Sequence, residues 1–166
     1  MKIRPRMLSL VLAGCAMMPA SPTHAAPPVP ASPDASTLPA TLTRYHWQLH
    51  DAVDNSGKRL DALFGLPDKP LQLDFADGRL RVSNTCNRIG GSYLVVEDHL
   101  RVTQMMHTMM ACHDRTLMQR ESTINSVLRG SPTLILSGEG STPLLTLTAD
   151  DGQTLTFSGS PVTQTR

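Results

Sequence analysis

Cysteine, histidine and methionine side chains gather in one stretch of the chain, residues 84–112. This stretch holds two of the three cysteines, four of the nine methionines and the only Gly-Gly pair. A thiol can act as a nucleophile when a base activates it, and thioether and imidazole groups bind soft metals such as Cu(I). The stretch therefore raises three hypotheses: a catalytic thiol, a metal site and a structural cross-link.

A catalytic thiol would be Cys86 or Cys112 with a histidine as its base. Cys112 and His113 are neighbours in the sequence, and neighbouring side chains diverge in an extended segment. The chain contains no nucleophile-elbow motif, no HExxH motif and no glycine-rich phosphate loop. These observations favour a protein that is not an enzyme and has no cofactor.

A metal site would use the methionines and the histidine between residues 105 and 110. In an extended segment Met105, His107 and Met109 lie on one face, so these three are the candidate Cu(I) ligands. A periplasmic copper-binding protein is therefore the alternative function. In the other interpretation the methionines are adaptable filler of the core beneath a helix.

The N-terminus has the pattern of an export signal. Residues 1–6 are basic, and the apolar run 7–14 is too short to span a bilayer. Residues 12–15, Leu-Ala-Gly-Cys, resemble a bacterial lipobox, which predicts a signal peptide of residues 1–14 and acylation of Cys15. The alternative is cleavage after residue 25, which would release a soluble periplasmic protein. We expect the acylated form, on the periplasmic side of a bacterial outer membrane.

Composition divides the rest of the chain. Residues 15–41 are rich in Pro, Ala and Ser without apolar periodicity, which predicts a tether rather than a folded segment. The remaining length suits one domain, expected at 42–158 with a C-terminal tail at 159–166, and we expect a monomer. The formal net charge of +1 gives no electrostatic reason to expect nucleic acid or an anionic surface as a partner.

The pattern of apolar residues predicts an α+β fold. About seven short strands at hairpin spacing indicate a curled antiparallel β-sheet, with Trp47 and Leu49 of the first strand facing the core. The clearest hairpin joins 71–75 to 80–83 through Ala-Asp-Gly. One amphipathic helix, capped by Asp114 and ended by Gly130, is expected to pack on this sheet.

The number of cysteines in the mature chain indicates whether a structural disulfide can form. Cys15 is either acylated or removed with the signal peptide, so the mature chain keeps the pair Cys86 and Cys112. An even pair in an oxidising compartment predicts a disulfide. Closing a 26-residue loop would stabilise the fold by about 3 to 4 kcal/mol. The alternative is two buried free thiols.

Two blocks of residues, in this order, resemble a known family. The first is Cys86-Asn87-Arg88 followed by Gly91 and Tyr93, and the second runs from Met105 to Cys112 before the helix that contains Glu121. Together with the chain ends at Trp47 and Phe157, they resemble the META domain, also called the HslJ-like family, over residues 42–157. The matching motif positions are Asn87, Arg88, Gly91, Tyr93, Thr108, Met110 and Ala111.

The resemblance implies more than the residues alone do. The family implies an antiparallel-sheet domain, often an envelope lipoprotein, with links to heat-shock and antibiotic-tolerance phenotypes and no established catalytic activity. We therefore expect a non-catalytic envelope protein with a stress-protective or accessory role in binding a protein, peptide or lipid partner. Asn87, Arg88 and Tyr93 are candidate polar contributors to that binding surface, and their alternative role is to satisfy the backbone and to pack.

Overall fold

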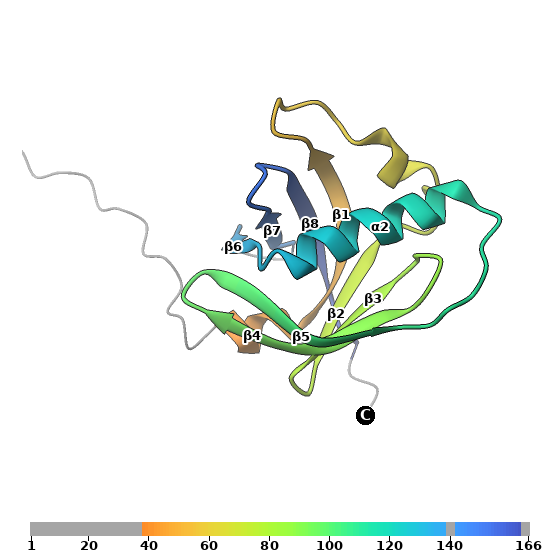
Figure 1. Cartoon of the computed structure of the whole chain (residues 1–166). Helices are drawn as coiled ribbons and strands as arrows, with labels where there is room; N and C mark the ends of the chain where they lie inside the picture. Colours follow the sequence, from red (N-terminus) through yellow and green to blue (C-terminus); the bar gives the residue numbers. More distant parts are fainter. Residues whose placement is uncertain (1–37, 139–141, 164–166) are drawn as a thin grey trace, which may run out of the picture. The chain divides into compact units, whose positions relative to one another are not determined.

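Eight antiparallel strands close into a barrel in the computed structural model, which describes residues 38–138 and 142–163 (Figure 1). Each strand pairs with the next along the chain, and β8 pairs with β1. The strands are β1 (Tyr45–Val53), β2 (Gln72–Ala76), β3 (Arg79–Ser83), β4 (Ile89–Val96), β5 (His99–His107), β6 (Thr133–Ser137), β7 (Leu144–Thr148) and β8 (Thr154–Pro161). The predicted curled antiparallel sheet is therefore confirmed, with eight strands rather than about seven.

One long helix, α2 (Arg115–Arg129), connects β5 to β6 and lies across the barrel in Figure 1. Asp114 caps it, as predicted, because its carboxylate accepts hydrogen bonds from the backbone N–H groups of Thr116 and Leu117 at 2.8 and 3.3 Å. The buried face of α2, which includes Ile124 and Leu128, packs into the core. The helix joins the two strands with the least pairing in the barrel, since β5 and β6 share a single residue pair.

The folded part begins and ends outside the limits predicted from composition. The short helix α1 (Leu38–Leu42) lies in the predicted tether, yet Leu38 and Leu42 are buried. The indole Nε1–H of Trp47 donates to the carbonyl oxygen of Leu42 at 2.9 Å, which fixes α1 against the barrel. At the other end β8 continues to Pro161, where Gly159 pairs with Trp47. Tertiary contacts order both segments despite their composition.

The hairpin of β2 and β3 has the predicted turn. Asp77 and Gly78 both have positive φ, 50° and 70°, as a type I′ turn requires. Its register places Leu73 opposite Val82 and Phe75 opposite Leu80, with all four side chains in the core.

The strands β4 and β5 form a long hairpin. The register between them shifts from Gly90 to Ser92, because Gly91 alone lies opposite two residues of β5, Gln104 and Met105. The bulge therefore lies on β5, where Gln104 has a positive φ of 51°. A Cβ atom on Gly91 would lie 2.7 Å from the carbonyl oxygen of Thr103, closer than any side chain tolerates. Glycine at this position therefore permits the close approach of the two strands.

The predicted signal peptide, Cys15 and the cleavage site after residue 25 lie outside the described residues. Within the described ranges, no helix has the length and apolar character that a membrane span requires.

An unexpected arginine anchors the loop between β1 and β2 to α2. The side chain of Arg120 is fully buried, and it donates to the carbonyl oxygens of Leu63, Leu66 and Lys69 at 2.8, 3.2 and 2.6 Å. A further carbonyl, of Asn84, accepts at 3.4 Å. Burial lowers the pKa of the Arg120 guanidinium, but a guanidinium remains charged at physiological pH. One side chain thus supplies hydrogen-bond donors to the backbone carbonyl groups of η1 (Asp61–Phe64) and of the segment that follows it.

Replacing Arg120 with methionine should remove this anchor. We expect Arg120→Met to lower the free energy of unfolding by about 3 kcal/mol, because the buried carbonyl groups lose their donors. Urea unfolding followed by circular dichroism measures the change. Arg115→Met, on the exposed first turn of the same helix, is the control and should cost at most about 0.5 kcal/mol. Equal losses in the two variants would contradict the anchoring role.

Candidate functional site

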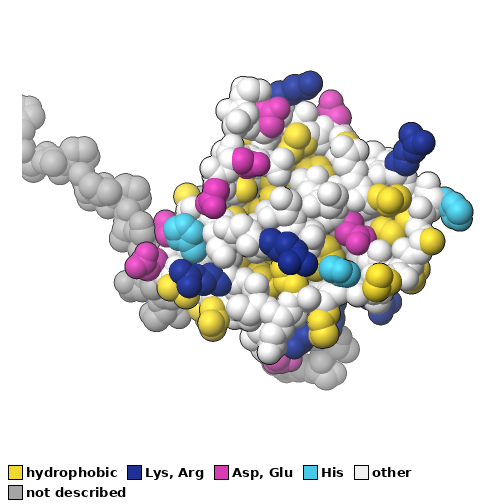
Figure 2. All heavy atoms as spheres, viewed as in Figure 1, with side chains coloured by type: hydrophobic (Ala, Val, Ile, Leu, Met, Phe, Trp, Pro, Cys, Tyr) yellow, Lys and Arg dark blue, Asp and Glu magenta, His cyan; other side chains and the backbone are white. Residues whose placement is uncertain are grey.

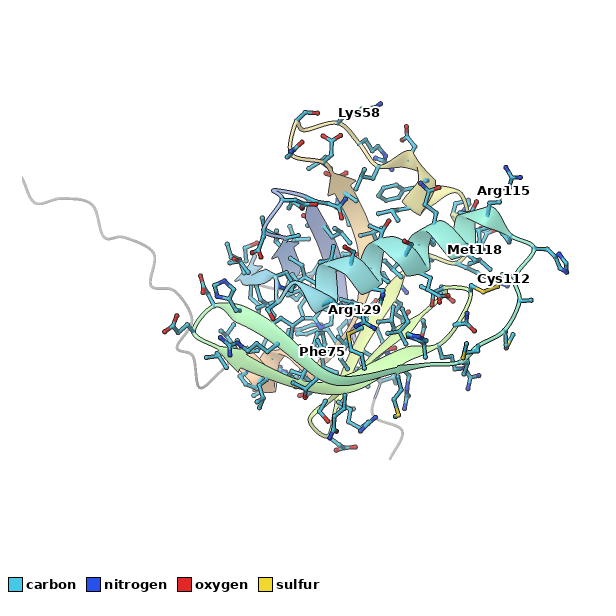
Figure 3. All side chains as sticks on the ribbon, viewed as in Figure 1. Lys58, Phe75, Cys112, Arg115, Met118 and Arg129 are labelled. Carbon is cyan, nitrogen blue, oxygen red and sulfur yellow. A yellow bond between two sulfur atoms is a disulfide. The ribbon has the colours of Figure 1, made fainter. Side chains whose placement is uncertain are left out.

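The two motif blocks meet through a disulfide. Cys86 and Cys112 are bonded with an S–S distance of 2.06 Å and a Cα–Cα distance of 5.9 Å, as predicted. Figure 3 shows this bond next to the N-terminal end of α2. The backbone N–H of Cys86 also donates to the carbonyl oxygen of Leu117 at 3.4 Å. Since both sulfurs are bonded to each other, neither carries a thiol that could act as a nucleophile.

Asn87 connects the second block to the first through its side chain. Its Oδ1 accepts from the backbone N–H of Met110 at 2.6 Å and from the Thr108 hydroxyl at 3.0 Å. Its Nδ2 donates to the Met110 carbonyl oxygen at 3.4 Å and to Glu121 Oε1 at 3.3 Å. The carboxamide thus both donates to and accepts from the same residue, Met110, much as a β-sheet partner would.

Glu121 extends this network onto the helix. Its Oε2 accepts from the backbone N–H of Asn87 at 2.6 Å, while its Oε1 accepts from the Asn87 side chain. The Asn87 carbonyl oxygen accepts from the hydroxyl of Thr85. Every polar group of Asn87 therefore has a partner, and the residue is only 9% exposed. We call the set of Cys86, Asn87, Thr108, Met110, Cys112 and Glu121 the clasp.

The remaining motif residues have structural or surface positions. Tyr93 is buried, and its ring meets Phe75 edge to face with centroids 4.9 Å apart, while burial raises the pKa of its hydroxyl. Arg88 pairs with Thr108 through its backbone and leaves its side chain exposed. Ala111 is exposed. The packing role suggested for Tyr93 and the backbone role suggested for Asn87 therefore agree with the structure.

The methionines do not fill the core as predicted. Of the methionines between residues 105 and 110, only Met105 packs against the core, whereas Met106, Met109 and Met110 are 63%, 94% and 65% exposed. Met118 on α2 is also 52% exposed. The clasp explains this difference, because it holds the segment through the backbone of Met110 and leaves the side chains outside. In Figure 2 hydrophobic side chains gather at the end of the domain where α2 begins.

The candidate copper ligands lie in unlike surroundings. Met105 is half-buried within β5, whereas Met109 lies beyond the end of that strand and is almost fully exposed. The extended spacing that placed them on one face ends at His107. In the part of the chain that the structure describes, no group of three or more His, Cys, Asp or Glu side chains could hold a metal ion. Copper binding by Met105, His107 and Met109 stays a prediction.

Two sets of contacts were not predicted from the sequence, those of Arg120 and the link between Asn87 and Glu121. The role of Arg120 could have been suspected, since it lies four residues before Ile124 on the buried stripe of α2. The partners of Asn87 and Glu121 could not, because 34 residues separate them and nothing local indicates the contact. Together, the geometry defines a class: a small antiparallel barrel whose single long helix is fastened to two strand ends by a disulfide and a buried amide.

Comparison with known proteins agrees with this class. The family model of the META domain matches residues 40–161, and the chain belongs to the META domain family. An NMR structure of a protein from Burkholderia xenovorans is 20% identical, with a TM-score of 0.65 over 85% of this chain and 98% of that one. A second NMR structure is 23% identical, with a TM-score of 0.52 over 72% and 92% of the two chains. At these identities the likeness concerns the fold alone. A search of curated proteins gave no match.

The Asn87 carboxamide can be tested by a nearly isosteric change. Asn87→Asp removes the two N–H donors and places a carboxylate beside Glu121. We expect a loss of about 3 kcal/mol in the free energy of unfolding at neutral pH, since a buried acceptor loses its donor and two carboxylates repel each other. The loss should shrink as the pH falls, because the folded variant binds a proton more tightly than the unfolded chain does.

The matched control is Asn125→Asp on α2, where the side chain accepts from Arg129 and can continue to do so. It should cost at most about 0.5 kcal/mol. Urea unfolding of both variants between acidic and neutral pH makes the comparison. If Asn87→Asp proves as stable as Asn125→Asp at neutral pH, the clasp does not depend on the carboxamide.

Proposed function

We propose that this protein is an exported, non-catalytic accessory domain of the bacterial cell envelope with a stress-protective or binding role. It acts on the periplasmic side, as an outer-membrane lipoprotein acylated at Cys15, or as a soluble periplasmic protein if the chain is cut after residue 25. The single observation that carries this proposal is the disulfide between Cys86 and Cys112.

The disulfide supports export because such bonds persist in oxidising compartments and are rare where thiols are kept reduced. The signal-like residues 1–14 point to the same compartment from independent residues. Cys15 is the one cysteine left outside the disulfide, and acylation would give it a role. Family membership supports the absence of catalysis, since the META domain is not known as an enzyme family.

The exposed methionines support a role in binding. Met109, Met110 and Met118 present flexible, polarisable side chains, and such side chains adapt to different apolar partners. The clasp holds the backbone beneath Met110 in place, so a partner would meet a surface that is already formed. Less conformational entropy is lost when a surface is ordered before it binds.

Thiol trapping in intact cells tests the proposal. Alkylation before lysis, without reductant, should leave Cys86 and Cys112 unlabelled, and reduction should expose both. The intact mass of the mature protein should show acyl chains on Cys15, while an unmodified N-terminus at residue 26 would indicate the soluble form. Full labelling of both cysteines, together with recovery of an uncleaved chain in the cytosolic fraction, would contradict the proposal.

A further inference from the structure

Four arginines point outward from adjacent strands of the barrel. In β3, Arg79 and Arg81 are exposed and alternate with buried residues. Arg88 is exposed immediately before β4, and Arg101 is exposed on β5. Because successive side chains of a strand point to opposite faces, all four lie on the outer face of β3, β4 and β5.

The strand register brings these arginines around small residues. Arg79 is opposite Ser92 of β4, and Arg81 is opposite Gly90. Arg88 precedes Gly90 by two residues and lies on the same face, about 7 Å along the strand. Neighbouring strands place opposed residues about 5 Å apart. Three guanidinium groups can therefore reach the space above Gly90, which has no side chain to occupy it.

These four arginines form no direct ion pairs within the part of the chain that the structure describes. The ion pairs there involve Arg59 and two histidines. Asp74 lies opposite Arg81 in the register, but its carboxylate accepts from His46 at 2.6 Å and from Gln72 at 3.0 and 3.1 Å. The net charge of +1 does not reveal that four arginines lie on adjacent strands.

Apolar side chains are exposed on the same face. Met106 is opposite Gly90, and Leu94 is opposite Arg101, and each is 63% exposed. Val96, further along β4, is 40% exposed. A surface that combines basic and apolar side chains suits the boundary between lipid headgroups and acyl chains, where phosphates meet the cations and apolar groups insert. A soluble anion would use only the cations.

We propose that the outer face of β3, β4 and β5 docks on an anionic lipid bilayer, with Arg79, Arg81 and Arg88 binding headgroup phosphates and Leu94 and Met106 entering the headgroup layer. An anionic bilayer would thus be a partner of the envelope protein proposed above. The docking depends on that proposal only because export would bring the domain to a membrane. It differs from the lipid anchor, since the contact belongs to the folded domain and needs no acyl chain.

Vesicle binding tests this face directly. The exported full chain carrying Cys15→Ser has no acyl group and is mixed with vesicles of phosphatidylcholine alone or with added phosphatidylglycerol. Co-sedimentation should show binding only to the anionic vesicles, weakening as salt is raised. Arg79→Gln, Arg81→Gln and Arg88→Gln together should lower the partition coefficient on the order of 100-fold, since each basic residue contributes about fivefold near an anionic surface.

The matched control removes the same charge elsewhere. Lys58, Arg115 and Arg129 belong to the loop before η1 and to the two ends of α2 (Figure 3). We expect the loss of binding when these three are replaced by glutamine to be at least about tenfold smaller than the loss in the variant that lacks Arg79, Arg81 and Arg88. Equal losses in both triple variants would overturn the proposal, because net charge alone would then explain the binding.

Other outcomes decide between sources of phosphate. Displacement from the vesicles by inorganic phosphate, at an ionic strength where chloride has no effect, would overturn docking in favour of a phosphate-ion site. Equally tight, arginine-dependent binding to duplex DNA would overturn it as well. Urea unfolding shows whether each triple variant is folded. If one is not, the chain without arginine substitutions still tests the proposal, because binding that does not require anionic lipid or does not weaken with salt would overturn it.

Discussion

The carboxamide of Asn87 is the contact on which the arrangement of this domain most depends. It is nearly buried, and its donors and acceptors are shared between the segment before α2 and the helix itself. Only an amide presents an acceptor and a donor pair together in this geometry, so neither a carboxylate nor an apolar side chain of similar size could replace it. The disulfide adds stability by lowering the conformational entropy of the unfolded chain, whereas the amide stabilises the folded chain through its hydrogen bonds.

Local signals predicted the local elements. The turn at Asp77-Gly78, the cap at Asp114 and the end of the helix at Gly130 each depend on residues within a few positions of one another. The pairing of Cys86 with Cys112 followed from counting thiols in an oxidising compartment. The burial of Arg120 is at least consistent with its position on the buried stripe of α2. The carbonyl groups it binds, and the link from Asn87 to Glu121, lie 34 or more residues away along the chain, and no short pattern reveals these partners.

The methionine segment shows how tertiary contacts can reverse a reasonable prediction. Apolar composition suggested core packing, and the extended spacing suggested one face of ligands. Instead, Gln104 has a positive φ of 51° within β5, and the segment beyond His107 is held through its backbone. The side chains are thereby turned outward. The charges show the same effect, since this near-neutral chain folds so that four of its arginines lie on adjacent strands of the barrel.

Amide hydrogen exchange tests the central role of the clasp most directly. The backbone N–H groups of Asn87 and Met110 donate to Glu121 and to the Asn87 side chain. Both groups should exchange only through openings whose free energy approaches that of global unfolding, although Met109 beside them is almost fully exposed. If the two N–H groups exchange as quickly as those of an unstructured loop, the side-chain amide does not fasten the helix to the strands, and the account is wrong.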